Sequence, residues 1–186
     1  MQSKLIFGAL FGIFLTSTFD HNSSHQDAII FRMTNAVCES YNQSWFVFHT
    51  CRLKALSRSK VVFNMNGTIL HPVNDITIRV RVFKRASGYK PWLFNIYFDA
   101  CQYLRKPNVP FVKLVYGLFK EFSNINHSCP YVGLQIIKGF YPKTELFPLP
   151  FPSGDYMLTG QWYFDKKPQF DTNISFAFVE DLLKNN

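Results

Sequence analysis

The chain has 186 residues, of which 47% are apolar, 18% aromatic and 17% charged. This composition excludes an intrinsically disordered chain, and the length suits one domain because chains usually divide only beyond about 250 residues. The net charge of +8 comes from 20 Lys and Arg against 12 Asp and Glu, but no basic run marks a nucleic-acid-binding tail. We therefore expect one folded domain and no nucleic-acid partner.

The first 19 residues have the pattern of a secretory signal peptide. Lys4 precedes an uninterrupted apolar run of 11 residues at 5–15, and small residues for cleavage follow at 16–18. A membrane-spanning helix needs about 20 apolar residues, so this run is too short to be one. We expect a signal peptide at 1–19, a single secreted domain at 20–186, and no transmembrane anchor in the mature chain.

Alternation of apolar and polar residues predicts strands along most of the chain. The expected strands cover residues 29–37, 45–56, 61–65, 76–82, 91–98, 131–138, 156–164 and 174–178. Asn66-Gly67 is a tight-turn signal after the third strand, and Gly88 and Gly154 are turn signals before the fifth and seventh. Seven or eight short strands of this kind predict an all-β fold, an immunoglobulin-like two-sheet sandwich.

One segment between the strands has helical spacing instead. Its apolar residues recur every three or four positions from Phe111 to Phe122, and Pro110 suits a helix start. Asp99 is expected to cap a shorter helical turn through Leu104. The proline-rich stretch 141–152 is expected to be an extended loop, because proline cannot donate to a sheet ladder.

The cysteines and glycosylation sequons agree with export. The chain has four cysteines and no CxxC pair, and an even number in a secreted chain predicts two disulfides. Among three possible connectivities we favour Cys38–Cys51, which flank a possible hairpin, and Cys101–Cys129, which bracket the helical segment. The five Asn-x-Ser/Thr sequons, each a potential glycosylation site, are at Asn22, Asn42, Asn66, Asn126 and Asn173.

No catalytic or metal-binding motif is visible. The five histidines lack metal-ligand spacing, and there is no nucleophile elbow or phosphate-binding loop. His127 is expected to form a hydrogen bond that fixes its own loop. Asp165 and Asp171 are an acidic pair that folding could bring together, which keeps an unrecognised hydrolase as an alternative. We expect no enzymatic activity, no cofactor and no metal ion.

The basic residues around the fourth strand allow two interpretations. Arg79 and Arg81 alternate with apolar residues, and Lys84, Arg85 and Lys90 follow. They form either a solvated outer face of the sandwich or a patch for an acidic partner, such as a receptor or anionic headgroups.

The aromatic content is the most informative feature. The 21 Phe, 9 Tyr and 3 Trp exceed what a sandwich of this size needs. The rings either fill a solid core or line a cavity between splayed sheets, and both interpretations stay open. The candidate lining residues are Phe83, Trp92, Phe94, Phe98, Phe119, Trp162, Phe164, Phe176 and Phe178.

Several segments together resemble a known family. They read FRMTNAVCES at 31–40, KRASGYKPWL at 84–93, NINHSCPY at 124–131 and PSGDYML at 152–158. Over about residues 28–182 the chain resembles a large insect family of secreted proteins of unknown function, whose relatives include the CheB-type chemosensory proteins of flies.

That family is distantly similar to the MD-2-related lipid-recognition and GM2-activator-like proteins, which are disulfide-linked β-sandwiches that hold acyl chains or sterols between their sheets. The resemblance implies a secreted, non-enzymatic protein that binds a lipid or small hydrophobic molecule, with a role in chemosensation or lipid handling. The alternative is an extracellular interaction module with a solid core.

Overall fold

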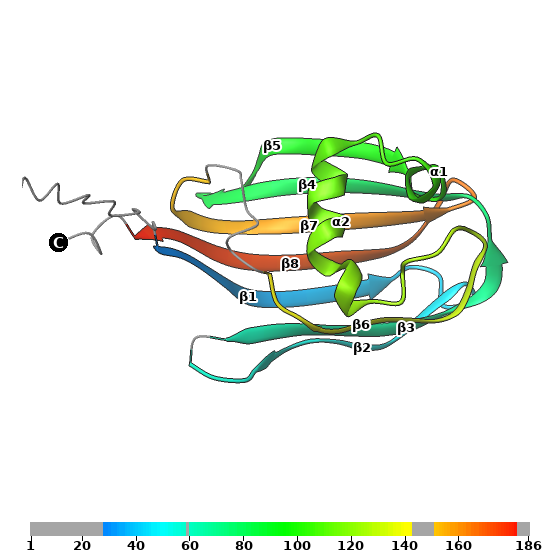
Figure 1. Ribbon diagram of the computed structural model, residues 1–186, viewed down its shortest axis with the longest axis horizontal. Coiled ribbons are helices and arrows are strands. Elements are labelled where there is room, and N and C mark those ends of the chain that lie inside the picture. The colour runs from blue at the N-terminus through cyan, green and yellow to red at the C-terminus, as the bar shows by residue number, and fades with distance from the viewer. Residues whose placement is uncertain (1–27, 59, 143–150, 182–186) are drawn as a thin grey trace, which may run out of the picture.

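The computed structural model describes residues 28–58, 60–142 and 151–181 (Figure 1). The predicted signal peptide, the Asn22 sequon and most of the proline-rich stretch lie outside these residues. In chain order the elements are β1 (Ala28–Ser40), β2 (Phe46–Ala55), β3 (Val61–Val73), β4 (Ile76–Ala86), β5 (Gly88–Asp99), α1 (Ala100–Arg105), α2 (Pro110–Phe119), the 3₁₀ helix η1 (Lys120–Phe122), β6 (Tyr131–Phe140), β7 (Gly154–Phe164) and β8 (Lys167–Asp181).

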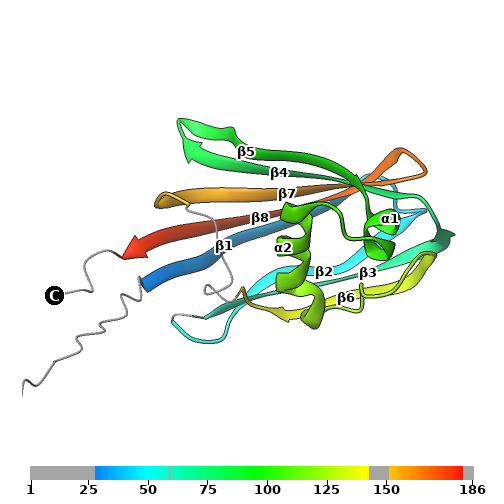
Figure 2. The same cartoon turned by 45° about the horizontal axis from the view of Figure 1, so that its top comes forward.

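The strands form two antiparallel sheets, which confirms the predicted all-β sandwich. The large sheet has the order β1-β8-β7-β4-β5, and the small sheet has the order β2-β3-β6. Figure 2 shows the two sheets facing each other, with α2 in the space between them. The helices therefore occupy the interior side of both sheets rather than an outer face.

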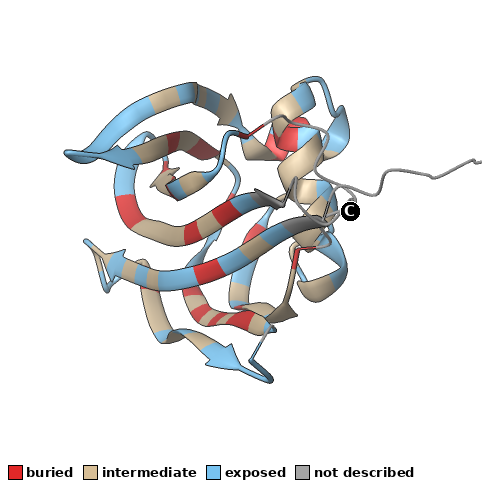
Figure 3. Cartoon of the chain, turned by 90° about the vertical axis from the view of Figure 1, so that its left-hand side faces the viewer, coloured by how far each residue is buried: buried red, intermediate tan, exposed pale blue. Residues whose placement is uncertain are grey.

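Period-two alternation places one face of each strand in the core. In β4, Ile76, Ile78 and Val82 are buried, whereas Arg79 and Arg81 between them are only partly covered. Figure 3 shows buried, half-buried and exposed positions following one another in short bands along the strands. This is the arrangement expected where one face of a sheet packs and the other meets solvent.

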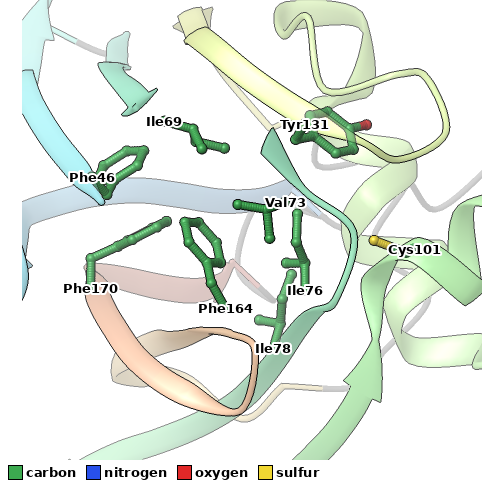
Figure 4. Close-up of a cluster of buried hydrophobic side chains, with 9 residues drawn as sticks. All are labelled: Phe46, Ile69, Val73, Ile76, Ile78, Cys101, Tyr131, Phe164 and Phe170. Carbon is green, nitrogen blue, oxygen red and sulfur yellow. The ribbon is translucent and has the colours of Figure 1, made fainter. Parts of the chain in front are cut away.

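The main core cluster links the two sheets. Its nine buried residues come from β2, β3 and β6 of the small sheet, β4, β7 and β8 of the large sheet, and α1 (Figure 4). The Phe46 and Phe170 rings stack with centroids 4.0 Å apart and so join the sheets directly. Burying an aromatic or aliphatic side chain of this size contributes about 1.5–3 kcal/mol.

The Asn66-Gly67 turn prediction is wrong, because β3 continues through both residues to Val73. Gly67 makes room for a ring instead. A Cβ built at Gly67 would lie 2.5 Å from Cζ of Phe46, which is closer than atoms can approach. The same Cβ would lie 2.8 Å from the carbonyl oxygen of Val47, a backbone atom that cannot move aside as a side chain can. Gly88, by contrast, takes a φ of 86° at the start of β5, as a turn glycine should.

The helical segment and its cap agree with the sequence prediction. Asp99 caps α1 by accepting a hydrogen bond of 2.8 Å from the Gln102 backbone N–H. The segment expected at 111–122 forms α2 through Phe119, and its last turn tightens into η1. Pro110 occupies the first turn of α2, where its missing N–H leaves no intrahelical bond unmade.

Both disulfides have the favoured pairing. Cys38–Cys51 joins β1 to β2, and Cys101–Cys129 joins α1 to the loop before β6. No described cysteine is free. Disulfides of this kind are typical of proteins in oxidising compartments.

Candidate functional site: an apolar cavity between the sheets

A partly open cavity of about 240 Å³ lies between the two sheets. Its walls come from all five strands of the large sheet, from all three strands of the small sheet, and from α1 and α2. The lining is dominated by aromatic and aliphatic side chains, and none of its described members carries a charge. An apolar lining of this kind offers water few hydrogen-bond partners and suits an apolar guest.

Five of the nine predicted lining residues face this cavity: Phe98, Phe119, Trp162, Phe164 and Phe176. Three others, Trp92, Phe94 and Phe178, lie beside it in a cluster built around Phe151 and Tyr156. Phe176 belongs to both groups, so the cluster continues the cavity wall.

Phe83 lies outside the cavity, on the outer face of the large sheet. The lining residues of β4 are Ile76, Ile78, Val80 and Val82, and alternation puts position 83 on the other face. The Arg81 guanidinium lies 5.4 Å from the centroid of the Phe83 ring, on that outer face. The abundance of aromatic residues in the sequence did not distinguish Phe83 from the rings that face inward. Its position in the alternation of β4, next to the inward-facing Val82, would have done so.

Regular alternation brings Trp92 and Phe94 to the inner face of β5, because positions 92, 94, 96 and 98 are partly buried and the positions between them are exposed. Arg81 pairs with Asn95, but Phe83 pairs with Pro91, so β5 holds two extra residues opposite β4. An insertion of two residues leaves the alternation unchanged, and Leu93 within it takes a φ of 48° and is 68% exposed. The Trp92 ring centroid lies 5.0 Å from that of Tyr156, and the Phe94 ring centroid lies 4.0 Å from that of Phe111.

The helices form one wall of the cavity because both ends of the segment are attached to strands. At its beginning, the Phe111 ring of α2 stacks on Phe94 of β5 with an interplanar angle of 18°. At its end, Phe122 of η1 meets Phe140 of β6 edge to face at 5.7 Å. The chain beyond η1 then pairs with β6, where the Asn124 side chain accepts from the Ile136 N–H at 2.7 Å.

Most polar groups of the lining are satisfied within the protein. The Trp162 indole N–H donates to Thr172 Oγ1 at 3.2 Å, and the Tyr116 hydroxyl donates to the Ile125 carbonyl at 2.9 Å. The Tyr131 hydroxyl donates to the His127 carbonyl. Burial raises the pKa of both tyrosines, so they stay neutral at physiological pH. The exceptions among the described lining residues are Gln135 and Thr159, whose Oε1 and Oγ1 atoms are buried without a partner.

The contribution of the small sheet was missed in the sequence. Phe46, Phe63, Met65 and Ile69 line the cavity from β2 and β3, and Gln135 lines it from β6. The apolar alternation from Phe63 to Ile69 was a usable signal. It was hidden by Gly67, which stands at an inward position but reads as a turn residue.

The remaining sequence candidates lie apart from the cavity. Asp171 accepts a hydrogen bond of 2.6 Å from the Tyr41 hydroxyl, while Asp165 stands in the turn after β7. The His127 ring hydrogen-bonds the Ser128 carbonyl at 2.7 Å and stacks on Tyr131, so it fixes its loop as expected. Within the described ranges no three His, Cys, Asp or Glu side chains gather as metal ligands would.

The basic residues of β4 are partly paired on the outer face. The Arg79 Nε–H donates to Asn95 at 3.0 Å, and Arg85 lies 3.8 Å from the Asp155 carboxylate. Both pairs are surface interactions that contribute little stability. They fit the interpretation of a solvated face.

The four described sequons differ in accessibility. Asn126 is exposed, whereas Asn42 and Asn173 are half-buried. Asn66 lies within the central strand of the small sheet, and its Oδ1 is buried without a partner. Asn126 is therefore the sequon most open to modification.

Comparison with known proteins adds a family match over part of the chain. Residues 78–158 match the family described as "Protein of unknown function (DUF1091)". This stretch runs from β4 to the middle of β7 and includes both helices. No curated protein matches the chain. In the part of the chain that the structure describes, no helix has the length and apolar character needed to cross a membrane.

Proposed function

We propose that this protein is a secreted, non-enzymatic carrier or receptor component that binds a small hydrophobic molecule in the cavity between its sheets. The apolar cavity of about 240 Å³ is the observation that carries the proposal. A solid-core interaction module would have no reason to keep this space open. The two disulfides support export, and the resemblance to lipid-recognition sandwiches supports a lipid-like guest.

The volume limits the size of the guest. An apolar cavity of about 150 Å³ takes benzene, so by proportion this one accommodates about ten carbon atoms. Burying ten methylene groups at about 0.8 kcal/mol each gives roughly 8 kcal/mol before association costs are subtracted. The expected ligands are therefore medium-chain molecules with affinities in the micromolar range or weaker.

The test compares a cavity-filling variant with a matched surface variant. Val80 lines the cavity from β4, whereas Val37 lies on β1 and is 48% exposed. Val80→Phe should weaken the binding of 1-decanol at least tenfold in titration calorimetry, and Val37→Phe should leave it unchanged. The proposal fails if the wild-type protein does not bind 1-decanol, or if Val80→Phe binds it equally well.

Native mass spectrometry provides an independent test. Protein secreted from insect cells should carry a small apolar molecule that denaturation releases, and its N-terminus should begin near residue 20. Retention of the first 19 residues would contradict the proposed export.

A further inference from the structure

We propose that the ligand is a medium-chain fatty acid, whose tail fills the cavity and whose carboxylate binds between the ammonium groups of Lys84 and Lys90. This inference rests on the proposed function and specifies the chemical class of its ligand. The two lysines belong to the segment KRASGYKPWL at 84–93, in which a turn at Gly88 joins β4 to β5. This turn lies at the end of the sandwich where β1 begins and β8 ends (Figure 1).

The turn places the two lysines directly opposite each other. Lys84 of β4 pairs with Lys90 of β5, and directly paired residues share a face of the sheet with their Cβ atoms about 5 Å apart. Like charges at such positions are destabilising. In the part of the chain that the structure describes, neither lysine has an ion pair, because the carboxylate of Asp155 lies beside Arg85 instead. An anion bound between the lysines would offset their repulsion.

Both lysines belong to the inner face of the large sheet. Lys84 follows Val80 and Val82 in the alternation of β4, and both valines line the cavity. Lys90 precedes the inward-facing Trp92 in the same way on β5. The arginines of β4 stand at the alternate positions and face the opposite side. The lysine pair is therefore a concentration of positive charge on the side of the sheet that holds the cavity.

The cavity extends along the sheet as far as the lysine pair. Lys84 pairs with Tyr156 of β7, and Tyr156 pairs with Phe176 of β8. Phe176 pairs in turn with Met33 of β1, and both of these residues line the cavity. Val82 also lines it and precedes Lys84 by two positions, which is about 7 Å along the strand. A tail packed against Val82 therefore brings its head group within reach of the Lys84 side chain.

The lysine pair remains open to solvent. The Lys84 Nζ lies 5.7 Å from the centroid of the Tyr156 ring, which is itself fully buried. Lys84 is half-buried and Lys90 is exposed. Long cationic side chains commonly cover apolar surface with their stems in this way. A carboxylate between the two lysines thus keeps part of its hydration and avoids the cost of a fully buried charge.

A carboxylate suits this pair better than a neutral head group does. Its two oxygens can accept one charge-assisted hydrogen bond from each ammonium, and such bonds are about twice as strong as neutral ones. A hydroxyl group would leave the repulsion between the lysines in place. The uncharged lining then holds the tail, and the lysine pair selects the head group.

The experiment measures the Kd of decanoate at pH 7 and of 1-decanol for matched lysine variants. Lys84→Met and Lys90→Met each keep an unbranched side chain and remove one positive charge. Lys167→Met removes the same charge at the opposite end of the large sheet, where Lys167 is exposed and pairs with Phe164. We expect the first two variants to bind decanoate about tenfold more weakly and 1-decanol unchanged. Lys167→Met should match the wild-type protein for both compounds.

A reversed charge tests the repulsion without any ligand. Lys90→Glu replaces a like-charge pair by an opposite-charge pair, so it should raise the thermal unfolding midpoint of the ligand-free protein by about 1–3 °C. The same variant should bind decanoate at least tenfold more weakly than the wild-type protein does. An unchanged or lower midpoint would show that the two lysines do not repel each other, and would remove the basis of the inference.

The possible failures can be told apart. The inference is overturned, while the proposed function stands, if the wild-type protein binds 1-decanol but not decanoate, or if Lys84→Met and Lys90→Met keep the wild-type affinity for decanoate. It is also overturned if these variants weaken both compounds equally, because that result indicates a structural role. If the wild-type protein binds neither compound, the proposed function fails as well.

Discussion

The two long edges of the sandwich are closed in different ways. At one edge β1 contacts β2, Cys38–Cys51 links the two strands, and the Ser40 hydroxyl donates to the Phe46 carbonyl at 2.6 Å. Met33 of β1 also packs with Phe63 and Met65 of the small sheet, directly inside this edge. We refer to it as the strand-closed edge.

At the other edge β5 and β6 are bridged by the helical segment rather than by each other. The bridge is held by the rings of Phe94 and Phe111 at β5, by Phe122 and Phe140 at β6, and by Cys101–Cys129. We refer to it as the helix-closed edge. Because a helix is wider than a strand, bridging with α2 holds the sheets further apart on this side and leaves space beside it for a guest.

The first prediction compares the two disulfides, which should give the largest effect. Cys38→Ala/Cys51→Ala should lower the free energy of unfolding by about 3 kcal/mol, and Cys101→Ala/Cys129→Ala by about 3.5 kcal/mol, because the second closes a longer loop. The pairs are 13 and 28 residues apart. Urea unfolding followed by tryptophan fluorescence measures both values.

Hydrogen exchange then separates the edges. Amides of α2 should exchange faster only when Cys101–Cys129 is removed, because only that bridge ties the helical segment to the loop before β6. Faster exchange of α2 after loss of Cys38–Cys51 would mean that the edges are not independent.

The second prediction concerns the start of the helix-closed edge. Asp99→Ala should destabilise the protein by about 1 kcal/mol, since α1 loses its N-cap hydrogen bond from Gln102. Asp99→Asn keeps an acceptor at the same position and should be nearly neutral. Thermal unfolding of both variants provides the comparison, and an equal loss in the two would show that charge rather than capping matters here.

The third prediction concerns the strand-closed edge and gives the smallest effect. The hydrogen bond to Asp171, assisted by partial burial, raises the pKa of Tyr41 from 10.0 to about 12. A raised pKa favours the neutral tyrosine in the folded state. This contribution to stability is therefore complete below pH 10 and is lost as the pH rises through about 12.

Ultraviolet titration of tyrosinate can detect this group. The difference between the wild-type protein and Tyr41→Phe isolates the Tyr41 signal, and Asp171→Asn should move its midpoint toward 10.0, the value of an unperturbed tyrosine. A midpoint near 10.0 in the wild-type protein would mean that the hydrogen bond is not formed in solution.

The elements that depend on local patterns could be predicted from the sequence. Period-two alternation located the strands, Pro110 and the spacing after it located α2, and Asp99 was recognised as a cap. The disulfide pairing followed from what each cysteine pair brackets. All these signals act within a few residues of the chain or through one covalent link.

The cavity wall could be predicted only in part, because it depends on register and on close contacts between distant segments. Phe83 and Trp92 look equivalent as rings, but Phe83 pairs with Pro91 on the outer face, so Trp92 at the next position lies on the inner face. The inward side of β3 was hidden because the reason for Gly67 lies on β2, in the Phe46 ring. Gln135 carried no signal, since a single glutamine in a strand is usually solvated.

The contact between Gly67 and Phe46 also constrains how sequences of this type can diverge. A side chain at position 67 would meet both the Phe46 ring and the backbone carbonyl oxygen of Val47, so a smaller residue at position 46 would remove only one of the two clashes. In related chains, glycine at position 67 should therefore persist even where position 46 carries a smaller side chain. Position 46 can change by itself, at the cost of the ring's packing, whereas position 67 cannot.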